Sequence, residues 1–152
     1  AAMRAGQGIA GYFATPPFTQ VLQADPKIRA IMTSTGLIGS GDITAATLNA
    51  KQGFVDANPK VAQAIRAGME DAVALIRSDP KRAATIYLAS EQVQIDRAQV
   101  ETILTDGSIV YDVAPKGMVN LAKAMATQGF LRKVPGDWQE IFFPGLQGRD
   151  GS

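Results

Sequence analysis

The first candidate chemistry lies where a short apolar run meets two prolines. Residues 9–13 read IAGYF, and Thr15, Pro16 and Pro17 follow directly before a helix-like pattern. The end of a strand next to the N-terminus of a helix forms a pocket that favours anions, because the first N–H groups of a helix have no partner within it. We expect such a pocket here, although the two prolines lack N–H groups and leave few donors.

Aromatic rings surround this corner of the sequence. Because the Thr15 hydroxyl and a few N–H groups of the next turn are the remaining donors, we expect shape and ring stacking to contribute more than hydrogen bonds. A structural interpretation is also open, since Thr15 is a good N-cap and Pro16 a good first residue of a helix. The rings that would stack belong to Tyr12, Phe13 and Phe18.

A second candidate is a run of hydroxyl side chains before a glycine-rich loop. Thr33, Ser34 and Thr35 precede the sequence GLIGSGD, which begins at Gly36. Hydroxyls at such a point either bind an oxyanion or satisfy the backbone of the turn, and both interpretations stay open. The GSGD sequence lacks the Lys of a phosphate-binding P-loop and the helix that should follow it, so we give it no role.

Missing residue types restrict the chemistry further. The chain has neither Cys nor His, which removes thiolate nucleophiles, zinc–thiolate sites, imidazole ligands and the commonest general base. The carboxylate pairs Glu70–Asp71 and Asp96–Glu101 are expected on wet helix faces, where acids mainly add solubility. We therefore expect a protein that is not an enzyme and that uses no cofactor and no metal.

Composition and charge are those of a soluble globular protein of one-domain size. The 152 residues carry a net charge of +1 without a block of like charges, and 46% of them are hydrophobic. A nucleic-acid partner needs clustered Lys and Arg, and a membrane span needs about 18 apolar residues in a row. The sequence contains neither, so we expect no nucleic-acid partner and no membrane span.

Alternating apolar and polar residues predict strands in the first part of the chain, over residues 9–13, 28–34 and 42–50. A short helix is expected over residues 16–23. A three-stranded front with two open edges is prone to association. We therefore expect residues 9–13 to pair with a missing N-terminal half or with another copy of the chain.

Helix-capping signals divide the second part of the chain. Asn58–Pro59 and Asp79–Pro80 each combine an N-cap with a proline at the first helical position. Asp96 with Gln99 is typical of a capping box, and Gly129 is expected to end a later helix. Strands followed by helices favour an α/β fold. The helix that starts at Pro59 should bury an apolar stripe, which consists of Val61, Ile65, Met69, Ala72 and Ile76.

Three long stretches of the chain resemble the C-terminal half of a periplasmic substrate-binding protein. They are GYFATPPFTQVLQADPKIRAIMTS, FVDANPKVAQAIRAGMEDAVALIRSDPKRAATIYLA and APKGMVNLAKAMATQGFLRKVPGDWQEIFFP. In this order, the pattern F-x-x-x-N-P, the sequence GFL at residues 129–131 and the pattern D-W-x-x-I-F-F-P are similar to those of the nitrate/sulfonate/taurine class of ABC importers. That class includes binders of pyrimidine precursors.

The resemblance implies an α/β fold, namely a portion of a two-lobed type II periplasmic-binding-protein fold with few strands and a helix-rich C-terminal part. Residues 1–28 would form the end of the second lobe, with its last strand and helix. Residues 29–35 would form the hinge crossover, and residues 36–152 the C-terminal part of the first lobe. In such a fold the lobes close about the hinge because the solute binds the closed state more tightly.

The resemblance also implies a function. The chain would be the periplasmic solute-binding component of an ABC importer, capturing a solute between the lobes and delivering it to a permease in the inner membrane. The solute would be a small anion (sulfonate, nitrate or carboxylate) or a pyrimidine-like compound. The alternative is an enzyme on the same scaffold, related to thiamine-pyrimidine synthesis. Such enzymes consume a His of their own chain, so the absence of His disfavours this alternative. The expected ligand-binding positions are Tyr12, Phe13, Thr15, Pro16, Phe18, Thr33, Ser34 and Thr35.

Overall fold

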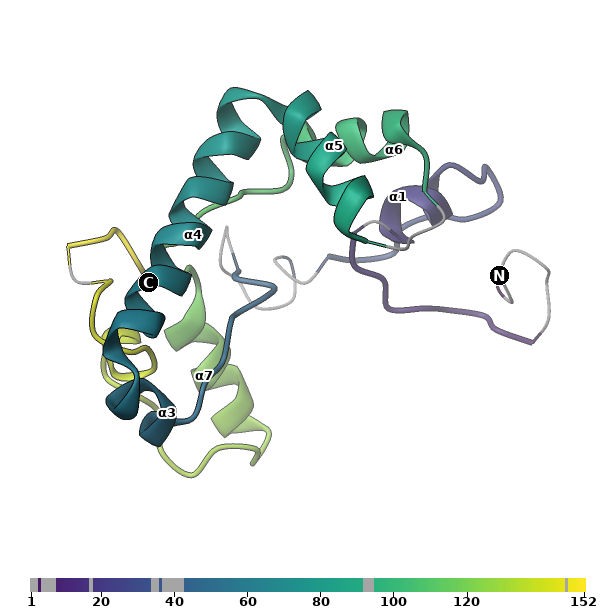
Figure 1. Ribbon diagram of the computed structural model, residues 1–152. Coiled ribbons are helices and arrows are strands. Elements are labelled where there is room, and N and C mark those ends of the chain that lie inside the picture. Colours follow the sequence, from purple (N-terminus) through teal and green to yellow (C-terminus); the bar gives the residue numbers. More distant parts are fainter. Residues whose placement is uncertain are drawn as a thin grey trace. The chain divides into compact units, whose positions relative to one another are not determined.

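The structure is a computed structural model whose regular elements, where it describes the chain, are helices (Figure 1). It describes residues 3, 8–16, 18–33, 36, 43–91, 95–146 and 148–152. The α-helices are α1 (Phe18–Gln23), α3 (Gln52–Ala57), α4 (Pro59–Ser78), α5 (Pro80–Ser90), α6 (Arg97–Leu104) and α7 (Met118–Thr127). A short 3-10 helix, η1, covers Trp138–Glu140.

The expected α/β fold, a portion of a two-lobed type II periplasmic-binding-protein fold, is wrong for the residues that the structure describes, because none of them forms a strand. Residues 9–13, 28–33 and 43–50 lie in coil instead. Within the described ranges, residues 9–14 make no backbone hydrogen bond, and residues 43–50 make one, from the Thr44 N–H to the Lys116 carbonyl. Alternation predicts an exposed and a buried face, but a strand also needs a neighbouring strand, which alternation does not supply.

The chain forms two groups of residues that pack among themselves. Unit 1 comprises Ala1–Ile31 and Asp71–Tyr111, and unit 2 comprises Met32–Glu70 and Asp112–Ser152. Helix α4 contributes its first part to unit 2 and its last part to unit 1. This grouping identifies neither lobes nor a hinge, so the division into residues 1–28, 29–35 and 36–152 stays a prediction.

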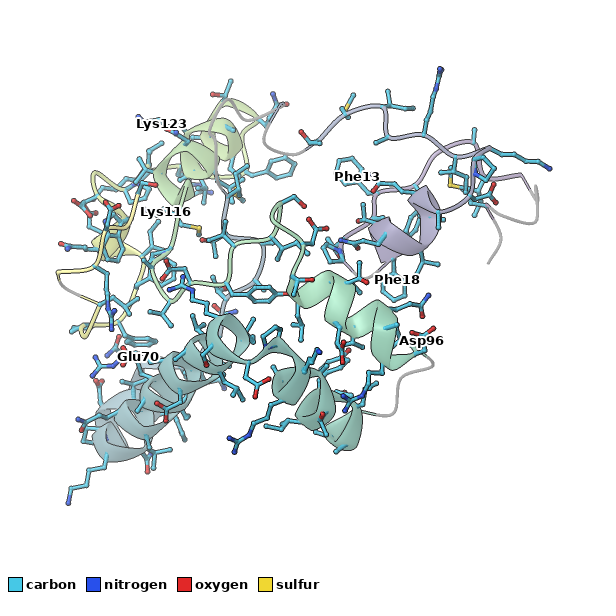
Figure 2. The ribbon with its side chains drawn as sticks, turned by 90° about the horizontal axis from the view of Figure 1, so that it is seen from above. Phe13, Phe18, Glu70, Asp96, Lys116 and Lys123 are labelled. Atoms are coloured by element: carbon cyan, nitrogen blue, oxygen red, sulfur yellow. The ribbon has the colours of Figure 1, made fainter. Side chains whose placement is uncertain are left out.

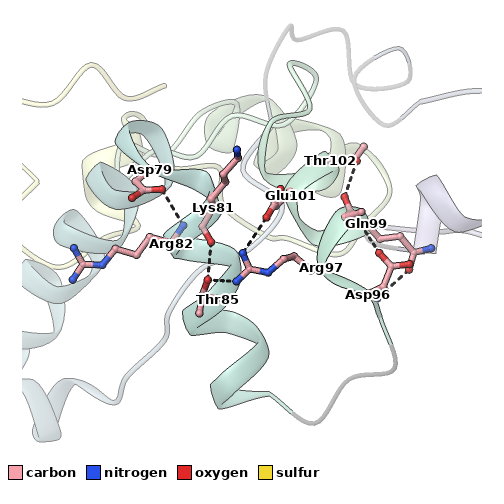
Figure 3. Close-up of polar contacts among 10 residues, drawn as sticks. Asp79, Lys81, Arg82, Thr85, Asp96, Arg97, Gln99, Glu101 and Thr102 are labelled. Atoms are coloured by element: carbon pink, nitrogen blue, oxygen red, sulfur yellow. Dashed lines mark hydrogen bonds and ion pairs between the residues drawn. The ribbon is translucent and has the colours of Figure 1, made fainter.

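In unit 1, helices α5 and α6 pack side by side, and both begin at the predicted caps (Figures 1 and 3). The Asp79 carboxylate accepts from the Arg82 N–H at 3.0 Å and caps α5. The Asp96 carboxylate accepts from the Gln99 N–H at 2.8 Å, and the Gln99 side chain accepts from the Asp96 N–H at 3.2 Å. The predicted capping box is thus confirmed. The buried hydrophobic residues of this unit are Ala83, Ala84 and Val100.

In unit 2, the start of helix α7 is held by a residue from far along the chain. The Met118 N–H donates to the Ser152 carbonyl at 2.8 Å, and the Gly117 N–H donates to the Ser152 hydroxyl at 2.9 Å. These bonds replace a local N-cap side chain, which α7 lacks. The buried hydrophobic residues of this unit are Ala122 and Trp138.

Helix α4 starts at Pro59 as predicted, but most of its predicted buried stripe is exposed. Val61, Ile65 and Met69 are 46%, 41% and 48% exposed, and Ala72 is exposed too, whereas Ile76 is half-buried. The burial prediction is therefore wrong for most of the stripe. Spacing by three and four residues identifies an apolar face, but it does not supply an element to cover that face.

Candidate binding cleft

A cleft of about 740 Å³ lies within unit 2. Its walls come from coil residues 44–50, helix α3, the first part of helix α4, residues 112–115 and residues 142–146. Sites for small molecules are typically hollows of roughly 300–1,000 Å³ with mostly apolar walls. The cleft therefore has the size of a small-molecule site.

Apolar side chains make up most of the cleft lining. Phe54 of helix α3 is 45% exposed, and Ile65 and Met69 of helix α4 are exposed to a similar degree. Phe142 and Phe143 on the C-terminal segment are half-buried, and Phe142 meets the buried Trp138 ring edge-on, with centroids 6.2 Å apart. Because removing apolar surface from water lowers the free energy, these walls favour an organic ligand with an apolar face.

A guanidinium group lies among these apolar walls. Arg66 of helix α4 is half-buried, and its Nη1 donates to the Gly145 carbonyl at 2.6 Å. Gly145 has a φ of +121°, which residues with a side chain rarely adopt, and a Cβ at this position would overlap Nη1 of Arg66 and displace the guanidinium. In the described part of the chain, Arg66 makes no other hydrogen bond or ion pair. Its remaining N–H groups can therefore donate to a ligand.

Two carboxylates also line the cleft. Asp56 accepts from the Gln52 side-chain amide at 2.7 Å, and Asp112 accepts from the Ala114 N–H at 3.0 Å. Together with Arg66, they give the lining one positive and two negative formal charges. A ligand that both donates and accepts hydrogen bonds suits this lining better than a bare anion, which two carboxylates would repel.

Hydrogen bonds between distant segments hold the cleft walls in place. The Thr44 N–H donates to the Lys116 carbonyl at 2.9 Å, and the Thr44 hydroxyl accepts from the Lys116 N–H at 2.7 Å. Two ion pairs bind the C-terminal segment: Lys116 to Asp150 at 3.0 Å, and Arg149 to Glu70 at 2.7 Å. Figure 2 labels Lys116 and Glu70, one partner of each pair. The cleft thus depends on contacts between residues far apart in sequence.

The aromatic corner predicted from the sequence does not line this cleft. Tyr12, Phe13 and Phe18 belong to unit 1 and are 62%, 80% and 59% exposed (Figure 2 labels Phe13 and Phe18). Thr15 and Pro16 are exposed as well, and the Thr15 carbonyl accepts the first backbone hydrogen bond of helix α1. A role of these five residues in solute binding stays a prediction.

The hydroxyl run is described only in part. The Thr33 hydroxyl accepts from the Gly36 N–H at 3.2 Å, which is the turn-satisfying role of the two left open by the sequence. Thr33 does not line the cleft. Ser34 and Thr35 lie outside the described residues, as does Pro17.

Arg66 was not predicted as a ligand contact, because its place beside the apolar stripe puts it on the charged face of the helix, which should meet solvent. Ala62, Arg66 and Met69 are spaced by four and three residues, so they share one face of helix α4, and all three line the cleft. The available signal was a cation that shares one helix face with Ala62 and Met69, since such a position combines a charge with apolar surface. Phe142 and Phe143 were likewise assigned no ligand role.

Unit 1 contains a smaller hollow of about 440 Å³ beside Asp106 and Tyr111. The Ser108 hydroxyl and N–H donate to Asp106 at 2.7 and 2.9 Å, and the Gln20 amide donates to it at 3.1 Å. These hydrogen bonds lower the pKa of the Asp106 carboxyl, whereas burial, together with the Asp106 charge, raises the pKa of the Tyr111 phenol. Because the cluster joins helix α1 to the turn after helix α6, we assign it a structural role.

Neither a metal cluster nor a membrane helix is found where the structure describes the chain. No group of three or more His, Cys, Asp or Glu side chains is placed to hold a metal ion there, and none of the described helices is both long and apolar enough to cross a membrane. Comparisons with models of protein families, with curated proteins and with solved structures found no match for this chain. The resemblance to importer components therefore rests on the residue patterns alone.

Proposed function

We propose that this chain is the solute-binding component of an ABC importer and that the cleft of unit 2 holds the solute. One observation carries the proposal: two of the three sequence patterns that resemble this class contribute to the cleft lining, whereas the GFL sequence of residues 129–131 does not. The F-x-x-x-N-P pattern supplies Phe54 and Pro59, and the D-W-x-x-I-F-F-P pattern supplies Phe142, Phe143 and Pro144. Residues that make a pattern specific and also line one hollow are candidates for ligand contact.

In this role the chain binds its solute reversibly in the periplasm and delivers it, unchanged, to a permease in the inner membrane. Binding without transformation fits the lining. Its titratable groups are Asp56, Arg66 and Asp112, and the sequence offers neither a thiol nor an imidazole to add to them. Hydrogen bonds and apolar contact are sufficient for capture and release.

Among the expected solutes, the lining favours a pyrimidine-like compound over nitrate or another small anion. A flat heteroaromatic ring can pack against the Phe54, Phe142 and Phe143 side chains. Ring nitrogens and carbonyls accept from the Arg66 guanidinium, and an exocyclic amine donates to a carboxylate such as Asp56. A bare anion would form an ion pair with Arg66, but it would leave the apolar walls exposed to water, and the two carboxylates would repel it.

Isothermal titration calorimetry on the 152-residue chain tests this proposal. The panel contains an aminopyrimidine, an alkanesulfonate, a carboxylate and nitrate, and each solute is recovered and analysed afterwards. We expect the aminopyrimidine to bind best and to be recovered unchanged. Arg66→Gln should weaken binding about tenfold or more, because a hydrogen bond to a charged group contributes roughly 1.5–3 kcal/mol.

Arg132→Gln is the matched control, since Arg132 is an exposed arginine of unit 2 that does not line the cleft. It should bind the solute as the unchanged chain does. Tighter binding of the sulfonate or nitrate would overturn the pyrimidine preference. No binding of any solute, or equal effects of both substitutions, would overturn the assignment of the cleft. Conversion of the pyrimidine to a product would favour the enzyme alternative.

A further inference from the structure

We propose that two copies of this chain associate through residues 9–13, which pair as antiparallel strands about a two-fold axis at Gly11. This segment of unit 1 runs as open coil before helix α1 (Figure 1). Its backbone makes no hydrogen bond to the backbone of any residue that the structure describes. A row of unpaired N–H and C=O groups is a template for pairing with another chain.

The side chains of this segment are apolar and exposed. Tyr12 is 62% and Phe13 80% exposed, so most of each ring is uncovered, and Ile9 is 42% exposed. Figure 2 shows Phe13 on this coil segment. Exposed apolar side chains next to backbone groups without a partner among the described residues are typical of a surface that binds another protein.

The sequence of the segment is complementary to itself. Antiparallel pairing centred on Gly11 places Ile9 opposite Phe13 of the second copy, and Ala10 opposite Tyr12, on each side of the axis. A β-branched residue opposite an aromatic one is a favourable cross-strand pair. Because residues 8–24 contain no charged side chain, two copies bring no like charges together. These features favour a second copy over a charged partner.

The available area indicates a weak, concentration-dependent dimer. A fully covered aromatic side chain buries roughly 150–250 Å². With the exposures of Tyr12, Phe13 and Ile9 given above, and with the backbone included, each copy can bury at most about 500 Å², because a two-stranded pair leaves both of its faces open. The total is therefore at most about 1,000 Å², the lower limit of specific interfaces.

Cysteine cross-linking tests the pairing at its centre. The chain contains no Cys, so Gly11→Cys introduces a single thiol, and a Cβ at Gly11 would meet nothing within 4 Å. Directly opposite residues in antiparallel strands have Cβ atoms about 4.5–5.5 Å apart, close to what a disulfide needs. With oxidised glutathione, we expect the covalent dimer to form at least about tenfold faster than with Phe130→Cys, a 76% exposed position of unit 2. Equal rates would overturn the proposal.

Sedimentation velocity over a range of concentrations gives a second measurement that needs no cysteine. The unchanged chain should show a reversible dimer at high concentration, Phe13→Lys should abolish it, and the control Phe130→Lys should retain it. Since Phe13 is exposed and its segment makes no backbone hydrogen bond to the described residues, Phe13→Lys should keep the helical circular dichroism signal. A chain that is monomeric at every concentration would overturn the proposal. So would a dimer that survives Phe13→Lys, because it would form elsewhere.

Discussion

The α5–α6 pair of unit 1 and the cleft of unit 2 differ in the sequence separation of the residues whose hydrogen bonds stabilise each region. The caps of α5 and α6 join residues three positions apart, Asp79 with Arg82 and Asp96 with Gln99. In the cleft walls, the hydrogen bond between Arg66 and Gly145 spans 79 positions, and the bond between Thr44 and Lys116 spans 72. Local sequence therefore specifies the first region, whereas the second depends on contacts between segments.

The contact between α5 and α6 contributes little to stability beyond what the local caps contribute. Arg97 of helix α6 donates to the Thr85 hydroxyl of helix α5 and forms an ion pair with Glu101 at 3.3 Å (Figure 3). Arg97 is about half exposed, and exposed ion pairs contribute little to stability. Breaking one contact should thus have a small effect in the α5–α6 pair and a larger one in the cleft.

The largest effect is expected from Gly145→Ala. A φ of +121° is strained for any residue with a side chain, and the new Cβ would overlap the Arg66 guanidinium. We expect a loss of about 2–3 kcal/mol of local stability and displacement of Arg66. Hydrogen–deuterium exchange should show faster exchange across residues 142–146, and calorimetry should show weaker solute binding.

Gly148→Ala separates backbone strain from the overlap with Arg66. Gly148 also has a positive φ, +83°, but a Cβ there would meet nothing within 4 Å. Gly148→Ala should therefore lower the stability by about 1 kcal/mol and leave solute binding unchanged. Equal effects of the two substitutions would show that the contact with Arg66 does not matter for the cleft.

A smaller effect is expected from Thr44→Val. The substitution keeps the shape of the side chain but removes the acceptor for the Lys116 N–H, which is partly buried. Leaving such a donor unpaired costs about 1–2 kcal/mol, so amide exchange at residues 116–118 should become faster. Thr47→Val is the control, because the Thr47 hydroxyl bonds the exposed Asn49. If both variants exchange alike, the bonds of Thr44 are not what holds the segments together.

The difference between local contacts and contacts between distant segments explains which elements could be predicted from the sequence. The starts of helices α5 and α6 were predictable because Asp79 and Asp96 cap them with their own side chains, and α4 starts at Pro59, which favours the first helical position. The Asn58 side chain, predicted to cap α4, instead donates to the Phe54 carbonyl of α3. The strands could not be predicted in this way, because a strand needs hydrogen bonds to a neighbouring strand, and its own residues do not specify that neighbour. Residues 43–50 alternate as a strand does, yet they lie in coil and line the cleft.

The candidate site was harder to predict than the helices. An apolar stripe on a helix is the same pattern whether a core or a cleft lies against it, so Ile65 and Met69 were assigned to a core. Their partners across the cleft, Phe142 and Phe143, come from the other end of the chain. No periodicity connects such segments, and only their contacts in the folded chain bring them together.

The smallest effect is expected in the α5–α6 pair, from Asp96→Ala. The substitution removes the carboxylate that accepts from the Gln99 N–H but keeps the backbone N–H of residue 96, which can still donate to the Gln99 side chain, and the loss of an N-cap typically costs about 1 kcal/mol. Amide exchange should become faster over residues 97–100, and exchange in residues 142–146 and solute affinity should not change. Asp71→Ala, which removes an exposed carboxylate within helix α4, should leave exchange in α6 unchanged. If Asp96→Ala instead weakened solute binding, the α5–α6 pair and the cleft would be energetically coupled, and stability in unit 1 could not be treated as a local property.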